Sequence, residues 1–307
     1  MKWVSIAISI FTLTITGLWL LGNLISDRWG WSQWLAWIPT TVVLVLLITT
    51  FFITFISKCK KMSAFVTVIF TTSLLWFVFI ENKFFADTTS QQGFKIVGWT
   101  MSHPKEAVSK ESADQLIKLN GDITLLTHGW HVRGEHSIKE WIGKDNKRVI
   151  SGPFTLLTKL KVIEVQTLIA SDGVYLSMFT IDTTEQLGKP LVLWAIDLPS
   201  SLATIRMNTA SRVRRILDSI EYKRPDVVLG DFNMTRNSYA IKTMFPTLIE
   251  ASDIGGIGLI ASYPANFSLY HIDHILLSKA FNCSSYEVIN PGIGRHRVQI
   301  ALIDSKK

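Results

Sequence analysis

Three long stretches without a charged residue constrain the fold of this chain more than any other feature. They occupy residues 3–26, 29–57 and 62–80. Each stretch reaches the roughly 20 apolar residues that an α-helix needs to cross the hydrocarbon core of a bilayer. The first stretch is longer than the apolar core of a signal peptide, and no small-residue cleavage site follows it. We therefore predict a membrane anchor within residues 1–85, with transmembrane helices at about 3–26, 34–57 and 62–80.

The short connections between these stretches predict the orientation of the anchor. Residues 58–61 read Lys-Cys-Lys-Lys, and basic connections of this kind stay in the cytoplasm. Residues 27–34 have no net charge and are rich in Trp, as expected of an external interfacial belt. We expect a multi-pass cell-membrane protein with a cytoplasmic N-terminus and an extracytoplasmic C-terminal domain, periplasmic or extracellular. The inverted orientation, with that domain in the cytosol, stays open.

The net charge of +7 is divided unequally between the two parts of the chain. Residues 1–85 contain six basic and two acidic residues, a net charge of +4. The rest of the chain keeps 25 basic and 22 acidic residues, a net charge of +3. A domain that binds nucleic acid needs a stronger basic surface than this. We expect the lipid bilayer as a partner and do not expect nucleic acid.

A folded domain follows the anchor after a short polar tether. The tether, residues 86–92, reads Ala-Asp-Thr-Thr-Ser-Gln-Gln. Residues 93–307 alternate short β-rich runs with helical segments, which predicts a layered α/β domain. Strands are expected at residues 94–99, 123–126, 173–181, 191–196, 227–229, 274–277 and 298–303, and helices at 105–119 and 201–219.

Three segments near the end of the chain contain side chains suited to phosphate chemistry. The first, Gly-Asp-Phe-Asn, ends an apolar strand and presents Asp231 and Asn233 on one side of the sheet's edge. A carboxylate there can hold a metal or accept a proton, and an amide can donate to a phosphoryl oxygen. An ordinary Asx turn after a strand explains the same spacing. The other two segments are an Ile-Asp-His-Ile-Leu strand with Asp273 and a glycine-flanked loop with His296.

In this order, the three segments resemble the motifs of the endonuclease/exonuclease/phosphatase superfamily, and the resemblance covers essentially all of residues 93–307. It implies a DNase I-like, four-layered α/β sandwich, here preceded by three transmembrane helices. It also implies a divalent metal and the hydrolysis of a phosphomonoester, a phosphodiester or a lipid-linked pyrophosphate. The three-helix anchor is similar to that of bacterial membrane members, among them glycopeptide-resistance proteins thought to act on lipid-linked phosphates.

The resemblance implies a role for each of four residues. Asp231 matches the residue that orients or deprotonates the attacking water, and Asn233 matches the amide that contacts the phosphate. His296 matches the histidine that stabilises the phosphoryl transition state, and Asp273 matches the carboxylate that orients it. Such a pair is chemically sensible, because a carboxylate fixes the imidazole tautomer and raises its basicity. These four are the expected catalytic residues.

The metal-binding side departs from the family pattern. The family's metal-binding Glu falls on His128, its central His on Asp197, and the Asp of its final loop on Arg295, while its Asn after the first strand falls near Met101. Mg²⁺ prefers oxygen ligands, so these replacements should weaken it. The family implies Mg²⁺ or Mn²⁺, whereas His128, Asp197 and Asp231 together also suit Zn²⁺. Arg295 can instead bind the substrate phosphate as a fixed positive charge.

Two functions stay open at this stage. In the first, the protein is an anchored hydrolase that acts with a divalent metal on a phosphate-bearing small molecule or a lipid-linked substrate. In the second, it is a pseudoenzyme that binds a phosphate-bearing ligand or a protein partner. The second is open because phosphoryl transfer depends on charge neutralisation, and several metal-side residues are replaced.

Overall fold

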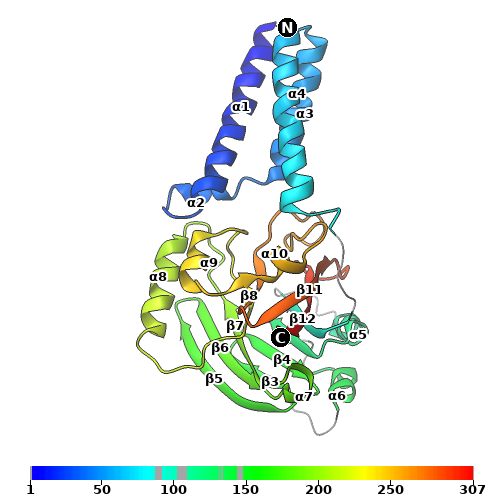
Figure 1. Cartoon of the computed structure of the whole chain (residues 1–307), viewed down its shortest axis with the longest axis vertical. Helices are drawn as coiled ribbons and strands as arrows, with labels where there is room; N and C mark the ends of the chain where they lie inside the picture. Colours follow the sequence, from blue (N-terminus) through cyan, green and yellow to red (C-terminus); the bar gives the residue numbers. More distant parts are fainter. Residues whose placement is uncertain are drawn as a thin grey trace.

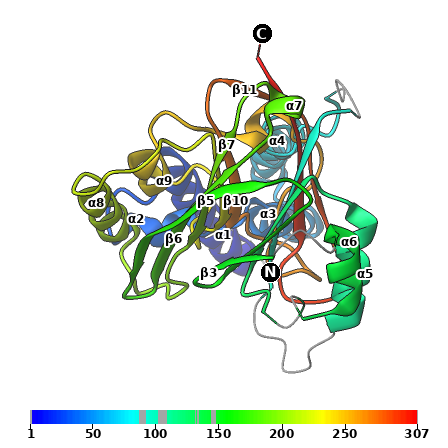
Figure 2. The same ribbon diagram turned by 90° about the horizontal axis from the view of Figure 1, so that it is seen from below.

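Two six-stranded β-sheets packed face to face form the centre of the C-terminal domain, and a bundle of long helices projects from one end of it (Figures 1 and 2). The computed structural model describes residues 2–86, 92–101, 109–130, 132, 134–143 and 148–306. Most of the predicted tether, and the beginning of the helix predicted at 105–119, lie outside the described residues.

The first sheet holds the beginning and the end of the domain, in the spatial order β11-β12-β1-β2-β4-β3. Its central strands β1 and β2 run parallel, and β12 pairs antiparallel with β1. Its members are β1 (Phe94–Thr100), β2 (Ile123–Thr127), β3 (Val149–Ser151), β4 (Phe154–Thr158), β11 (Phe281–Ile289) and β12 (Val298–Ser305).

The second sheet has the order β5-β6-β7-β8-β10-β9, with β7 and β8 parallel and β10 antiparallel to β8. Its members are β5 (Val162–Ser171), β6 (Val174–Ile181), β7 (Leu191–Asp197), β8 (Val227–Asp231), β9 (Ile249–Glu250) and β10 (Asp273–Leu277). The inner strands β7, β8 and β10 are buried along almost their whole length, which explains their continuous apolar sequences.

Helices cover the outer face of each sheet, so the domain has four layers. The helices α5 (Ser109–Leu119) and α6 (His136–Ile142) share a hydrophobic cluster with the first sheet. The helices α8 (Arg206–Leu217) and α9 (Tyr239–Met244) share another with the second sheet. Figure 2 shows the two pairs on opposite sides of the molecule. The predicted α/β sandwich is therefore confirmed.

A leucine of the second sheet packs directly over a glycine of the first. A Cβ atom at Gly98 would lie only 2.4 Å from Leu229 Cδ1 of the opposite sheet. A larger residue at this position would therefore force the Leu229 side chain to move. The short helices α7 (Thr184–Leu187) and α10 (Ala251–Gly255) lie at the ends of strands and complete the domain.

All seven predicted strands are present, but the strands β3, β4, β5, β9 and β11 were not predicted. The longest of these, β5, alternates between half-buried and exposed positions along its first six residues. Its sequence mixes Glu and Gln with Val and Ile, so it does not form an apolar run. The helix predicted at 201–219 begins only at Arg206. Polar edge strands and the first turns of helices are where the sequence pattern is weakest.

The N-terminal part consists of α1 (Lys2–Ile25), α2 (Ser32–Ala36), α3 (Thr40–Ile56) and α4 (Lys60–Leu75), the last continuing as a π-helix η1 (Trp76–Glu81). By length and apolar character two of these helices could cross a membrane, α1 with 24 residues and the continuous segment Lys60–Glu81 with 22. The third, α3, is apolar but has 17 residues.

The helix predicted at about 34–57 is divided into α2 and α3. Pro39 lies between them in an extended conformation, with φ of −72° and ψ of 139°. Proline has no N–H to donate within a helix, and it disfavours the helical conformation in the residue before it. The break therefore falls where the sequence places this proline.

A carboxylate of the N-terminal part caps a helix of the C-terminal domain. Asp27 lies between α1 and α2, and its Oδ1 accepts hydrogen bonds from the backbone N–H groups of Tyr239 (2.6 Å) and Ala240 (3.2 Å). The hydroxyl of Ser238, the N-cap residue of α9, donates to the other carboxylate oxygen. Unpaired N–H groups at a helix start favour a negative charge. The cap therefore joins the two parts at a point far from the covalent connection.

We expect Asp27→Ala to destabilise the domain by about 2 kcal/mol, because a hydroxyl and two N–H groups would lose a charged acceptor. For a domain of this size the melting temperature should fall by roughly 4–8 °C. The measurement is thermal unfolding of the full-length protein in detergent. The control is Asp218→Asn, which removes an exposed ion pair with Arg214 and should leave the melting temperature nearly unchanged. Equal melting temperatures for the two variants would contradict the capping role.

Candidate active site

The register of three neighbouring strands brings three carboxylates together at one edge of the second sheet. Asp231 ends β8 and lies opposite Asp273, the first residue of the antiparallel strand β10. Asp197 ends β7 and lies opposite Asp231 in the parallel pair. All three side chains are largely buried. The predicted catalytic residues Asp231 and Asp273 are therefore brought together, with Asp197 beside them.

His296 completes this group from the loop before β12. Its Nδ1 donates to Asp273 Oδ2 over 2.8 Å, and the hydroxyl of Thr100 donates to the other oxygen of Asp273. The carboxylate thus fixes both the orientation and the tautomer of the imidazole. Within the described residues, Asp231, Asp273 and His296 form a group whose ligand atoms all lie within 4.8 Å of one another.

The two sides of this group differ in pKa. Burial disfavours the charged imidazole of His296, but the negative charge and hydrogen bond of Asp273 outweigh it and raise the pKa of His296 to about 9. Burial, and the nearby charge of Asp273, raise the pKa of Asp231 well above its ordinary value. His296 is therefore a cation at neutral pH, and Asp231 is a more basic carboxylate than usual. This division suits an electrostatic stabiliser and a proton acceptor.

Asn233 holds the loop that follows β8 beside the site. Its backbone N–H donates to Asp231 Oδ1 (3.0 Å), which is the Asx turn that the sequence also allowed. Its side-chain Nδ2 donates to the carbonyl of Leu198 over 2.8 Å, and its backbone has a φ of +50°. The turn orients Asp231, and the amide fixes the loop after β7. The Asx turn is therefore present beside the carboxylate, and the amide is engaged by a backbone carbonyl.

On the metal side, His128 and Asp197 pair with each other. His128, which follows β2, has its Nε2 3.0 Å from Oδ2 of Asp197, the last residue of β7. Met101 is buried in the apolar cluster between the first sheet and its helices. Arg295 lies at the rim, where its guanidinium donates to the hydroxyl of Tyr263 over 3.0 Å. The structure therefore places His128 and Asp197 together, and Asp197 next to Asp231.

Two residues near the site were not predicted from the sequence. Thr100 gave no signal, because a threonine at the end of a strand is common. Arg206, the first residue of α8, is buried, and its Nη1 donates to the carbonyl of Pro199 over 2.7 Å. Burial lowers the pKa of this guanidinium, while the charges of Asp27 and Asp231 counteract the shift. Its charge therefore lies where it can act on the buried carboxylates, although the sequence shows only a basic helix.

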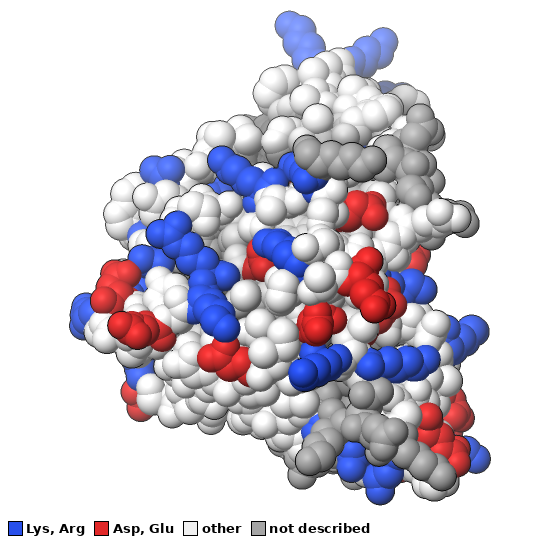
Figure 3. Space-filling model, turned by 60° about the horizontal axis from the view of Figure 1, so that its bottom comes forward, with Lys and Arg blue, Asp and Glu red and all other residues white. Residues whose placement is uncertain are grey.

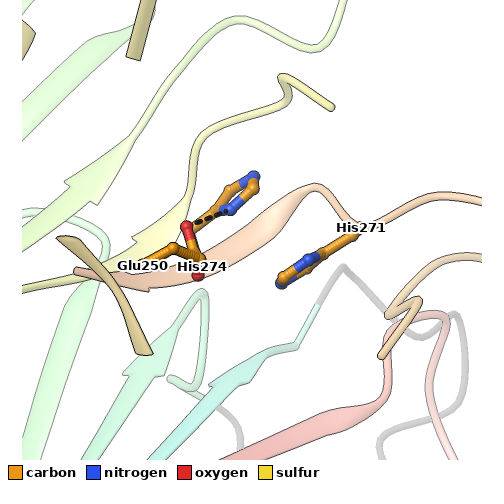
Figure 4. A group of neighbouring side chains, drawn as sticks. All are labelled: Glu250, His271 and His274. Atoms are coloured by element: carbon orange, nitrogen blue, oxygen red, sulfur yellow. Dashed lines mark hydrogen bonds and ion pairs between the residues drawn. The ribbon is translucent and has the colours of Figure 1, made fainter. Parts of the chain in front are cut away.

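A second cluster, Glu250, His271 and His274, lies on the other side of β10 (Figure 4). His274 donates through Nδ1 to Glu250 (2.9 Å) and through Nε2 to the carbonyl of Met234 (2.8 Å), so it is an imidazolium. Burial opposes this charge, but Glu250 raises the pKa of His274 overall. Both ring nitrogens of His274 are engaged in these hydrogen bonds, so it has no free lone pair for a metal ion, and its ring stacks on that of His271 with centroids 4.5 Å apart. We interpret the cluster as a structural ion pair.

The position of His271 departs from strand alternation. Alternation through residues 271–274 would place it on the face of Asp273, opposite His274. The strand β10 begins only at Asp273, so alternation does not extend back to His271. Its ring instead stacks on His274, and burial together with the neighbouring charge lowers its pKa.

Comparison with solved structures identifies the class of fold. An endonuclease/exonuclease/phosphatase from Bacteroides vulgatus superposes with a TM-score of 0.52 and 13% identity, covering 70% of this chain and 100% of its own. A protein of that family from Bacteroides thetaiotaomicron gives 0.53 and 13%, covering 70% and 99%. A mannosyl-6-phosphatase from the same organism gives 0.51 and 13%, covering 68% and 99%. No family model matches the sequence, and neither does any curated protein.

The C-terminal domain therefore has the fold of the endonuclease/exonuclease/phosphatase family, also called DNase I-like. The resemblance predicted from the three motif segments is confirmed at this level.

We expect Asp273→Asn to lower the pKa of His296 from about 9 toward 6.5, because burial would then be opposed only by the smaller effect of the Asp231 charge. Titration of the histidine ring signals by NMR measures this shift. Glu250→Gln is the matched control, since it removes the carboxylate partner of His274 and leaves His296 paired. An unchanged pKa of His296 in Asp273→Asn would contradict the assignment.

The same pairing should make stability depend on pH. The folded pKa of His296 is higher than the unfolded one, so the pair stabilises the fold fully below pH 6.5. This contribution should be lost as the pH rises through about 9, and Asp273→Asn should remove that part of the pH dependence.

Proposed function

We propose that this protein is a membrane-anchored phosphoesterase that hydrolyses a phosphate ester or a lipid-linked pyrophosphate outside the cytoplasm. The observation that carries the proposal is the buried group of Asp231, Asp273 and His296 at the strand ends of a DNase I-like fold. One structural neighbour is a mannosyl-6-phosphatase, which supports phosphoester chemistry on this fold.

The proposed mechanism divides the work between the two sides of the group. Asp231, with its raised pKa, accepts the proton of the attacking water. The His296 cation stabilises the negative charge on the phosphoryl oxygens in the transition state. Asp273 is a positioning residue that keeps His296 charged and oriented. Asn233 keeps Asp231 and the Leu198 loop in place.

The electrostatics of the site favour a bound divalent cation. Burial and the charges of Asp273 and Asp197 together raise the pKa of Asp231, which indicates negative charge that the protein alone does not neutralise. Asp197, Asp231 and His128 offer oxygen and nitrogen donors, which fit Zn²⁺ or Mn²⁺ better than Mg²⁺. When bound, the ion would neutralise charge on the substrate phosphate.

The N-terminal helices support the membrane location. Two of them are long and apolar enough to span a bilayer, and the basic residues 58–61 favour a cytoplasmic position for the connection between α3 and α4. The end of the second sheet that carries the site faces these helices. Thr235 lies two residues after Asn233, and its hydroxyl contacts the carbonyl of Ala36 in α2 (3.5 Å). A substrate carried on a lipid would therefore reach the site directly.

The net charge of only +3 over residues 86–307 does not favour nucleic acid as a substrate. In Figure 3, basic and acidic side chains are interspersed over the face turned away from the helices. Polyanion binding requires a continuous basic surface.

The contact between His128 and Asp197 favours the second candidate, a pseudoenzyme that binds a phosphate-bearing ligand. In that case the pair replaces the metal, and the domain only recognises its ligand. The two experiments below distinguish the candidates.

We expect the full-length protein in detergent to hydrolyse bis(p-nitrophenyl) phosphate or farnesyl pyrophosphate. Asp231→Asn and His296→Gln should each lower kcat/KM by at least about 100-fold, because each removes a proton acceptor or a transition-state charge. Asp218→Asn, on an exposed helix end, is the control for general effects. Equal rates in all four proteins would overturn the catalytic assignment, and no hydrolysis combined with phosphate binding would favour the pseudoenzyme.

Metal binding has a separate readout in thermal stability. Mn²⁺ or Zn²⁺ should raise the melting temperature, because an ion at 100 times its Kd adds about 2.7 kcal/mol to the free energy of unfolding. Mg²⁺ should raise the melting temperature less. The double variant His128→Ala/Asp197→Asn should lose this increase, while Glu250→Gln, in the second cluster, should keep it. A metal-induced increase that survives in the double variant would place the ion elsewhere.

A further inference from the structure

Five large apolar side chains form an exposed patch where the N-terminal helices meet the domain. Three belong to the connection between α1 and α3, and two belong to the loop between β7 and α8. Each is between 40% and 58% exposed. The rings of Trp29 and Trp31 stack with centroids 5.8 Å apart. The members of this patch are Trp29, Trp31, Trp34, Leu202 and Ile205.

Direct contacts join the two halves of the patch. The side-chain amide of Gln33 donates to the carbonyl of Leu202 (2.9 Å), and its Oε1 accepts from the N–H of Arg206 (3.1 Å). A Cβ atom at Gly30 would lie 3.2 Å from Ile205 Cδ1, so the connection rests directly on the loop. Figure 1 shows α2 beside the upper ends of α8 and α9. The loop and the connection therefore form one surface.

The same loop begins at the candidate active site. Leu198 follows Asp197, and its carbonyl accepts the hydrogen bond from Asn233 Nδ2 (2.8 Å). Residues 198–205, Leu-Pro-Ser-Ser-Leu-Ala-Thr-Ile, contain no charged residue. A single uncharged loop therefore links the site to the patch.

We propose that loop 198–205 inserts Leu202 and Ile205 into the interfacial region of the bilayer, beside the tryptophans of the connection. The patch is continuous with helices that are apolar on their outer faces, and tryptophan is the residue that favours the headgroup level of a membrane. Exposed apolar patches of this kind mark interaction surfaces. A patch that binds a protein partner could lie anywhere on the surface, whereas this patch adjoins the helices proposed to span the bilayer. The inference rests on the proposed membrane anchoring and concerns how the site is placed relative to the lipid.

The insertion gives the site a fixed position at the membrane surface. A phosphate group at headgroup level would then lie next to the loop that carries Leu198, and the lipid chain would stay in the bilayer. Leu202 and Ile205 act as membrane contacts here and touch no reacting atom.

The test uses full-length protein in phosphatidylcholine nanodiscs with a fluorescent label on single cysteines. Cys59→Ser removes the more accessible native thiol, and Cys283 is buried. The environment-sensitive dye NBD is attached at Leu202→Cys, and at Ser201→Cys, which retains Leu202. Trp31→Cys is the membrane reference, and Glu185→Cys on α7, at the far end of the domain in Figure 1, is the aqueous reference.

Lipids with a nitroxide spin label on the acyl chain should quench the dye at 201 and 202 at least about twofold more than at 185, because an inserted segment lies within the headgroup and acyl boundary. Its emission should also shift to shorter wavelength. Quenching at 31 without quenching at 201 or 202 would overturn the inference and leave the anchor intact. An absence of quenching at 31 would contradict the membrane location itself.

Discussion

Three buried carboxylates, which lie in register on three adjacent strands, dominate the electrostatics of the domain. Burying Asp197, Asp231 and Asp273 side by side costs free energy unless positive charge and hydrogen bonds compensate. His296 and a threonine hydroxyl compensate Asp273, and His128 pairs with Asp197. Asp231 keeps a raised pKa as a result. The chemistry that we propose follows from this incomplete compensation.

The helical part and the domain are joined by direct side-chain contacts in addition to the covalent connection between them. Asp27 caps α9, and Gln33 contacts Leu202 in the loop that leads into α8 and Arg206, the first residue of α8. The loops that carry Asn233 and Leu198 lie between these contacts and the site. The helical part therefore supports the same loops that shape the proposed active site, and the two parts are best studied in one chain.

The sequence predicted those parts of the fold in which a segment has a recognisable apolar run or motif. The buried strands β7, β8 and β10 are apolar runs, and the order of the motifs led to the correct fold and to the grouping of Asp231, Asp273 and His296. The sequence did not show partners from distant segments, so the contributions of Arg206 and Thr100 emerged only in three dimensions, whereas the family resemblance had already placed His128 and Asp197 in one site. The polar strands β5 and β11 were not predicted, because contacts with the adjacent strands stabilise them and their sequences have no apolar pattern.

The capping contact of Asp27 also changes what the tether has to do. Because the connection between α1 and α2 holds the domain from a point well before the tether in the sequence, the orientation of the domain does not depend on the peptide that follows η1. A cut in that peptide would leave two fragments joined by buried hydrogen bonds. The protein would then behave as a non-covalent complex of its own two halves, and the domain would not be released.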